Sequence, residues 1–415
     1  MIDETVRAKY KVVIGLEVHA QMLTASKAYS SDANRYGDAP NTLVSPITLG
    51  HPGTLPVMNE KTIEYAIRLG LACSCHISEK QHFARKNYFY PDLPKGYQIT
   101  QDKTPICTGG QIIIRDEHGK EKPVRLTRIH MEEDAGKSIH DIDVYDTLVD
   151  LNRAGVPLLE IVTEPDIESS QEAYNYLTEV RKLVRYLDIC DGNMEEGSLR
   201  CDANISVMLK DSTVFGTKVE VKNMNSMRNV QRAIDFEIER QIMAIENGET
   251  IVSETRSFDA LNGTTISMRS KEAANDYRFF PEPDLQPLVI DQKQIDTIKA
   301  EMPALPRDLF LKYTNELGLS AYDAYNLTDI KEIALYFEEV IKSTKNYKAA
   351  ANWMMGDIKS YMNQNGIEIE NFPIAPARIA ELIEIISSGK ISSTIASQKV
   401  FPEMLKNPSS TPLEI

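Results

Sequence analysis

Strict alternation between apolar and polar residues constrains the fold of this chain more than any other feature. Residues 11–21 and 199–207 both carry an apolar side chain at every second position. Because successive side chains of a strand point to opposite faces, the remaining polar residues of each segment share one face. These polar residues include Glu17, His19, Gln21, Arg200, Asp202, Asn204 and Ser206. The pattern predicts half-buried strands of an antiparallel or mixed sheet.

Other segments extend this sheet and add helices. Residues 158–164 and 217–223 also alternate like strands. Their polar side chains include Glu160, Glu164, Lys218, Glu220 and Lys222. Amphipathic helices are predicted after Ser169, which forms a capping box with Glu172, and after Ser226. Strands and helices in this uneven order favour an α+β fold over a doubly wound parallel sheet.

The chain of 415 residues is long enough for two or three domains. Strand-like segments dominate up to about Leu288, and helical periodicity dominates beyond Met302. The proline-rich stretch Phe280–Pro287 between them is typical of a boundary or a rigid loop. We therefore expect a mixed sheet domain followed by a helical domain.

Charge and cysteine content narrow the functional classes. With 46 basic and 61 acidic residues the net charge is −15, which excludes a broad electrostatic attraction to nucleic acid. Any nucleic-acid role then needs a local patch or a partner. The five scattered cysteines favour free thiols in a reducing compartment. The sequence contains neither a membrane-length apolar run nor a signal-peptide core, so we expect a cytoplasmic protein.

Neighbouring strands would gather several acidic side chains on one face. Carboxylates packed so closely raise one another's pKa, and a divalent cation removes the conflict. Oxygen ligands with one imidazole suit Mg²⁺ or Mn²⁺ better than zinc, and such an ion commonly carries nucleotide phosphates. The candidates on the predicted strands are Glu17, His19, Glu160, Asp202 and Glu220. The acidic run His130–Gly136 resembles a ligand-bearing turn, although parity alone does not decide which of its glutamates faces inward.

A solvated sheet face explains the same alternation. Half-exposed strands are common, so on alternation alone this interpretation is the more frequent outcome. Glu220 between Lys218 and Lys222 in particular fits a surface row of ion pairs. Longer sequence strings are needed to choose.

Several long strings resemble one family. They are Gly15–Gln21, His51–Pro56, Arg85–Gln98, His130–Ser138, Val149–Glu160, Met194–Asn204 and Asp276–Asp284. Together they resemble the B-subunit family of the aspartyl/glutamyl-tRNA amidotransferases, from about residue 11 to the end. The resemblance is specific, because none of these strings is a short motif shared with other folds.

The resemblance implies a fold and domain boundaries. The family has a glutamine-synthetase-like cradle domain with an antiparallel or mixed sheet, here residues 1–293, followed by an all-helical domain, here residues 294–408. Residues 409–415 would begin the linker to a tRNA-binding tail domain that this chain does not include. That would remove much of the expected tRNA contact surface.

The resemblance also implies a reaction. Such a subunit uses Mg²⁺ and ATP to phosphorylate the side-chain carboxylate of Glu-tRNA(Gln) or Asp-tRNA(Asn), and ammonia then displaces the phosphate. Phosphorylation matters because a carboxylate oxygen is a very poor leaving group. Since the chain has no Ser-rich amidase signature and no Cys–His nucleophile pair, a glutaminase partner must supply the ammonia. We expect a heterotrimer with an amidase A subunit and a small C subunit, and no membrane association.

Matching motifs carry site residues over from the family. The expected ligands of the catalytic Mg²⁺ are Glu17, His19, Glu133, Glu160 and Asp202, with Glu160 and Asp202 also assigned to the nucleotide. Lys86 and Tyr88 would face the phosphates or the acyl group, against the alternatives of an exposed lysine and a core aromatic residue. Arg200 is a weaker phosphate candidate and fits an ion pair within the sheet better.

One departure concerns zinc. Many relatives hold a structural zinc with four cysteines in an early loop. Here the corresponding positions are Ser30, Asp32, Ser45 and Thr48, so we expect no structural zinc.

Two alternatives to the tRNA-dependent amidotransferase subunit stay open. One is a free-standing glutamine-synthetase-like ligase that acts on a small molecule and needs no tRNA. The other is a noncatalytic tRNA-binding scaffold whose acidic face is only solvated.

Overall fold

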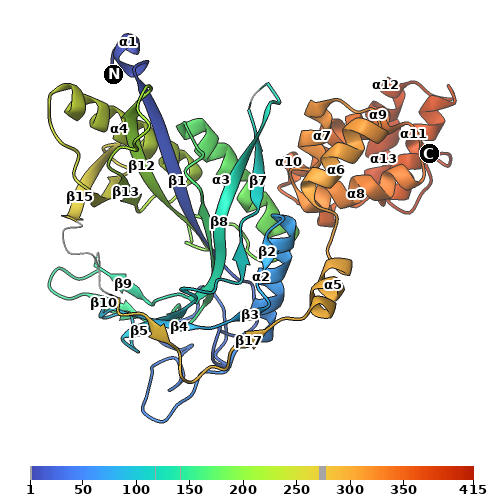
Figure 1. Cartoon of the computed structure of the whole chain (residues 1–415). Coiled ribbons are helices and arrows are strands. Elements are labelled where there is room, and N and C mark those ends of the chain that lie inside the picture. The colour runs from blue at the N-terminus through green and yellow to red at the C-terminus, as the bar shows by residue number, and fades with distance from the viewer. Residues whose placement is uncertain (1, 117, 141, 271–276) are drawn as a thin grey trace. The chain divides into compact units, whose positions relative to one another are not determined.

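A ten-stranded mixed sheet organises the N-terminal part of the chain in the computed structural model (Figure 1). The structure describes residues 2–116, 118–140, 142–270 and 277–415, so Asp276, the first residue of one family-like string, lies outside them. The chain divides into two units, Met1–Met302 and Pro303–Ile415. The sheet belongs to the first unit.

The strand order of the sheet is β15-β14-β13-β12-β1-β11-β8-β6-β2, with β7 paired to β8. The strands are β1 (Tyr10–Gln21), β2 (His76–Ile77), β6 (Cys107–Thr108), β7 (Gln111–Arg115), β8 (Glu121–Glu133), β11 (Pro157–Thr163), β12 (Leu199–Leu209), β13 (Val219–Lys222), β14 (Glu254–Asp259) and β15 (Thr264–Ser270). The β13–β14 pairing is parallel and the other pairings are antiparallel. The prediction of a mixed sheet in an α+β fold is confirmed.

β1 is the central strand of the polar and apolar faces. Its even-numbered residues from Val12 to Ala20 are buried, whereas Glu17, His19 and Gln21 are partly exposed on the other face. β12 shows the same alternation, with Cys201 and Ala203 buried. The alternation read from the sequence therefore gives the correct faces for both strands.

Helices pack against this sheet (Figure 1). The helices of the first unit are α1 (Glu4–Arg7), α2 (Glu60–Ala72), α3 (Ser170–Tyr186), α4 (Met227–Glu246) and α5 (Gln292–Ala300). The Ser169 hydroxyl accepts a hydrogen bond from the Glu172 amide at 3.1 Å and begins α3, as the capping box predicted. The Glu172 carboxylate accepts from the Glu168 amide at 2.8 Å, one residue before the expected partner.

Short strands form three smaller sheets, in the orders β16-β4-β5, β10-β9 and β17-β3. Their bounds are β3 (Lys80–Gln81), β4 (Ala84–Asn87), β5 (Tyr97–Thr100), β9 (Lys137–Ile139), β10 (Leu148–Asp150), β16 (Phe280–Pro281) and β17 (Leu288–Val289). β5 also packs against β8. This contact brings the Arg85–Gln98 string next to the main sheet.

The second unit is helical. Its elements are α6 (Pro306–Leu311), η1 (Lys312–Glu316), α7 (Ala321–Leu327), α8 (Lys331–Lys342), α9 (Tyr347–Trp353), η2 (Met354–Ile358), α10 (Lys359–Asn365), η3 (Ile369–Asn371), α11 (Pro376–Ser387), α12 (Ser393–Ile395), η4 (Ala396–Val400) and α13 (Phe401–Lys406). Aromatic pairs such as Tyr313–Phe337, with ring centroids 5.0 Å apart, lie in its core. The predicted helical region is confirmed.

The unit boundary differs from the expected one. We expected the helical domain to begin at residue 294, but the division falls after Met302. α5 packs against α2 and so belongs with the sheet unit. Residues 409–415, expected to begin a linker, are grouped with the second unit. Among the described residues, no helix is both long and apolar enough to cross a membrane.

Replacing Leu16 by Ala should test the core of β1. Leu16 is fully buried, so the cavity should lower the free energy of unfolding of the first unit by about 3 kcal/mol. The only tryptophan, Trp353, lies in the second unit, so its fluorescence transition in urea should stay unchanged while the far-ultraviolet circular dichroism transition shifts. Leu55→Ala, at an exposed site, is the control. Equal shifts in both variants would contradict the expectation.

Candidate functional site

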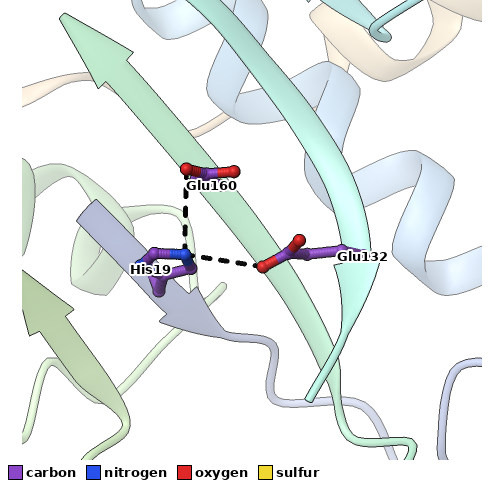
Figure 2. Close-up of side chains that lie close together, drawn as sticks. All are labelled: His19, Glu132 and Glu160. Carbon is purple, nitrogen blue, oxygen red and sulfur yellow. Dashed lines mark ion pairs between the residues drawn. The ribbon is translucent and has the colours of Figure 1, made fainter. Parts of the chain in front are cut away.

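Three side chains from adjacent strands meet on the polar face of the sheet (Figure 2). His19 Nε2 lies 3.5 Å from Glu132 Oε1 and 3.8 Å from Glu160 Oε1. One ligand atom from each of the three residues lies within 4.8 Å of the others. We call His19, Glu132 and Glu160 the first acidic group.

Strand register explains why these residues meet. On β1, β11 and β8, His19 is opposite Glu160, and Glu160 is opposite His130. Glu132 follows His130 by two residues and therefore shares its face. Three segments far apart in sequence thus supply one group of ligand-type atoms.

A buried histidine compensates the charge of this group. His130 Nε2 lies 2.7 Å from Glu160 Oε2 and 3.7 Å from Glu132 Oε2. Burial alone would lower the pKa of His130, but its hydrogen bonds to the two carboxylates raise it to about 9. Burial would likewise raise the pKa of Glu160 and Glu132, but the His130 contacts outweigh it and lower both. The carboxylates are therefore held ionised.

Glu133 does not join this group, contrary to the expected ligand set. In the antiparallel ladder Glu133 is opposite Pro157, and Glu132 is opposite Leu158. The Glu133 carboxylate turns away and accepts hydrogen bonds from Lys95 Nζ and, at 2.9 Å, from the Ile99 amide. Glu132 takes the place that the sequence interpretation gave to Glu133.

A second acidic group lies beside the first on the same face. It contains Glu17, Asp202 and Glu220, each with one carboxylate oxygen within 4.8 Å of the others. Glu17 is opposite Asp202 in the β1–β12 ladder, and Glu220 is opposite Asn204 in the next one. The five expected ligands therefore divide between two groups.

Lys222 already neutralises part of the second group. Its Nζ atom forms ion pairs with Asp202 and, at 3.2 Å, with Glu220. Burial would lower the pKa of Lys222, but the two carboxylates raise it, so the ammonium is retained. The expected row of ion pairs around Glu220 is present on this side.

Glu17 is the least compensated carboxylate of the second group. Burial and the charge of Glu160 raise its pKa, Lys222 opposes the shift, and Asp202 and Glu220 add to it. Glu17 Oε1 accepts a hydrogen bond from Asn204 Nδ2 at 2.9 Å. Glu17 is thus a partly buried carboxylate held at an energetic cost, which is typical of a functional group rather than a structural one.

Comparison with known proteins bears on what this site belongs to. A family model described as the GatB/GatE catalytic domain matches residues 12–296, and one described as the GatB domain matches residues 335–415. A relative from Thermodesulfovibrio yellowstonii is 50% identical over 398 residues, covering 96% of this chain and 83% of the relative. One from Chlorobium limicola is 52% identical over 390 residues, covering 94% and 82%. Both are named as the B subunit of an aspartyl/glutamyl-tRNA(Asn/Gln) amidotransferase.

The chain belongs to the amidotransferase B-subunit family. It is therefore one chain of a carbon–nitrogen ligase. The resemblance read from the strings of the sequence is confirmed.

The remaining expected residues of this amidotransferase chain lie around the acidic groups. Arg200 Nη1 lies 2.9 Å from Asp134 Oδ2, so the ion pair favoured from the sequence is the contact observed. Lys86 Nζ lies 4.9 Å from the centroid of the Tyr277 ring and 6.0 Å from that of Tyr88. The charge of Lys86 also helps to lower the pKa of Glu160, after burial and the two histidines. Lys86 therefore faces the first acidic group.

Sequence reasoning missed His130 and Lys222 as parts of the site. Both lie on the polar face by parity, and both stood in strings already singled out. The available signal was a basic side chain at the same parity as the acidic ones. Without the strand order, that signal did not show which carboxylates each cation would meet.

The four loop positions compared with cysteines in the amidotransferase family do come together in this chain. The hydroxyls of Ser30 and Thr48 lie 3.1 Å apart, and Asp32 Oδ2 accepts from the Ser45 amide at 2.8 Å and from Thr48 Oγ1 at 2.5 Å. Burial would raise the pKa of Asp32, but the Thr48 and Ser45 hydrogen bonds outweigh it and lower the pKa. The loop is joined by hydrogen bonds among side chains that suit zinc poorly.

Glu17→Gln should not destabilise the metal-free protein at neutral pH. Because the folded state raises the pKa of Glu17, its ionised form costs stability above the unfolded value near 4.5, and Gln removes that cost. We expect the melting temperature in chelator at pH 7.5 to equal or exceed that of the wild type, with the difference vanishing below about pH 4.5. Exposed Glu196→Gln is the control. A marked drop in melting temperature would make Glu17 structural.

Asp32→Ala should destabilise the early loop by about 1–3 kcal/mol at pH 7, because it leaves the partners of a half-buried carboxylate unpaired. The part due to the lowered pKa is present above the unfolded value of 3.8 and is lost as the pH falls through the folded value. Thermal melts between pH 3 and pH 7 measure both.

A zinc chelator should leave the wild-type melting temperature unchanged. Asp38→Ala in the same loop, where Asp38 pairs with exposed Arg35, is the control for Asp32→Ala. Chelator sensitivity restored by added zinc would contradict the expectation of a zinc-free loop.

Proposed function

We propose that this chain activates the side-chain carboxylate of Glu-tRNA(Gln) or Asp-tRNA(Asn) with ATP and Mg²⁺, and then amidates it with ammonia. The observation that carries the proposal is the first acidic group, where His19, Glu132 and Glu160 meet on the sheet face. The printed names of the relatives supply the tRNA-linked substrates. We also infer that the sheet unit is a glutamine-synthetase-like cradle, as the family resemblance implies.

The donor atoms of the first acidic group fit Mg²⁺. Two ionised carboxylates and one imidazole, with ligand atoms within 4.8 Å of one another, form an oxygen-rich set on a partly open face. His19, Glu132 and Glu160 would hold the ion, and bound Mg²⁺ would neutralise developing charge on the nucleotide phosphates. His130 would keep Glu160 oriented from behind, as supporting residues of metal sites do.

The second acidic group has a different role in this proposal. Lys222, held by Asp202 and Glu220, keeps its ammonium on the same face as the first group. That ammonium and Lys86 would bind the phosphates of ATP as point charges. Glu17, next to both groups, would orient whatever cation or ammonium the phosphates bring close.

The chemistry needs two displacements. A carboxylate oxygen of the aminoacyl group attacks the γ-phosphorus and ADP leaves, which gives an acyl phosphate. The lone pair of ammonia then attacks the acyl carbon, inorganic phosphate leaves with the former carboxylate oxygen, and the nitrogen loses a proton to give the amide. Positioning and charge stabilisation account for most of the catalysis of phosphoryl transfer, so a rigid sheet is a suited scaffold.

Ammonia would come from a partner. The five cysteines are free, and burial raises the pKa of Cys75 to about 12, so the thiols offer no activated nucleophile for glutamine hydrolysis. The proposal therefore includes an amidase A subunit and a small C subunit in a cytoplasmic heterotrimer. Because the relatives are named as one lettered subunit of an amidotransferase, a complex of several chains is supported.

Glu132→Gln and Glu160→Gln test the proposed centre. Each should lower ATP turnover with misacylated tRNA in the complex by roughly 10²–10³-fold, because each removes a charge that would hold the metal. Mn²⁺ affinity, measured by electron paramagnetic resonance, should fall with turnover. Glu164→Gln, at the end of β11 with its carboxylate on Thr127, is the matched control. Normal Mg²⁺-dependent turnover in both test variants would instead support the noncatalytic scaffold.

The small-molecule ligase is tested with the wild-type complex. Free glutamate, ATP and ammonia without tRNA should give no amide. Amide formation under those conditions would replace the tRNA-dependent proposal with a glutamine-synthetase-like activity on a free amino acid.

A further inference from the structure

Three arginines surround a hollow that the acidic groups do not use. The hollow has a volume of about 580 Å³, and its lining includes Arg181 and Arg185 of α3 and Arg228 of α4. All three side chains are exposed, and no residue that the structure describes forms an ion pair or hydrogen bond with their guanidinium groups. We call this site the arginine pocket.

The start of α4 adds positive potential to the arginine pocket. Ser226 caps this 20-residue helix by accepting from the Asn229 amide at 3.1 Å, and Ser226, Met227 and Arg228 all line the hollow. The amides of the first helical turn favour an anion.

Two acidic residues, Asp191 and Glu195, also line the arginine pocket. Asp191 is engaged locally, since its carboxylate accepts from the Asn193 amide at 2.8 Å and from Ser198 Oγ at 3.3 Å. Free cations therefore outnumber free anions in the lining, in a chain whose net charge is −15.

The arginine pocket lies at the same edge of the sheet as the first acidic group. Its loop, residues 191–195, leads through Ser198 into β12, and the Ser198 carbonyl accepts from the Gln21 amide at 2.8 Å. Two residues further on, Arg200 is opposite His19 in the β1–β12 ladder. Its other wall, residues 225–228, follows closely after Lys222 at the end of β13.

We propose that the arginine pocket binds backbone phosphates of the RNA whose aminoacylated end reaches the acidic groups. The inference rests on the proposed function. Exposed, unpaired arginines on separate elements suit a row of phosphodiesters, which bind through charge without base recognition. A free nucleotide is a poorer fit, because nucleotide sites are mostly apolar clefts with a few polar groups, whereas this lining is largely polar. A phosphate contact here would position the RNA beside the reaction centre.

The test compares Arg185→Gln/Arg228→Gln with Arg185→Lys/Arg228→Lys in the complete complex. Arg181 is kept, since its Cγ would lie 2.7 Å from a Cβ at Gly192 and it packs in the loop. Filter binding of tRNA from 50 to 300 mM salt should give a roughly tenfold higher Kd for the Gln pair at low salt and a shallower salt dependence. The Lys pair, which keeps both charges, should stay close to the wild type. Lys120→Gln/Lys210→Gln, at exposed sites, controls for lost charge.

Steady-state kinetics separates the possible ligands. The Gln pair should raise the KM for tRNA and leave the KM for ATP unchanged. Equal Kd values and salt slopes for the Gln and Lys pairs would overturn the inference while wild-type turnover upholds the proposed function. A raised KM for ATP alone would also overturn it, by making the hollow a nucleotide site. A wild-type complex that neither binds tRNA nor consumes ATP with it would overturn both.

Discussion

The pairing of β1 with β11 on one side and β12 on the other is the constraint on which the site depends. These two ladders set His19 opposite Glu160 and Glu17 opposite Asp202. A shift of one residue in either ladder would move every polar side chain of that strand into the core. The buried face prevents such a shift, because Ile14, Leu16 and Val18 have no comparable burial in any other register. Packing on one face of the sheet thus fixes the chemistry on the other.

The site meets the cost of clustered carboxylates in two different ways. In the first acidic group the cation is a buried histidine behind the carboxylates, and the pKa of Glu160 and Glu132 falls as a result. In the second it is Lys222, which lies among the carboxylates themselves. Because His130 leaves the open side of the first group unblocked by a fixed ammonium, that group is the better place for an exchangeable metal ion. The two groups therefore divide the work of binding a metal and binding phosphates in the proposed reaction.

Local patterns gave much of the fold from the sequence. Alternation placed the faces of β1 and β12 correctly, and the Ser169 and Ser226 caps marked the starts of α3 and α4. Strand order and register are not local, so the sequence did not separate the acidic residues into two groups. The choice between Glu132 and Glu133 failed for the same reason, since both are buried at the end of β8 and only the partner strand distinguishes them. The arginine pocket was out of reach too, because Arg228 is 43 positions from Arg185 and joins it only through the packing of α4 on α3.

The net charge of −15 and a tRNA substrate are compatible only if positive charge is local. Lys86 and Lys222 direct their charge toward the acidic groups, so they cannot also attract a distant polyanion strongly. Arg200 is likewise committed to Asp134. Cations that attract RNA must instead be unpaired, exposed and near the site, and Arg181, Arg185 and Arg228 meet these conditions. An acidic chain with a few free arginines beside its centre would select for correctly placed RNA, because binding elsewhere on its surface would be electrostatically unfavourable.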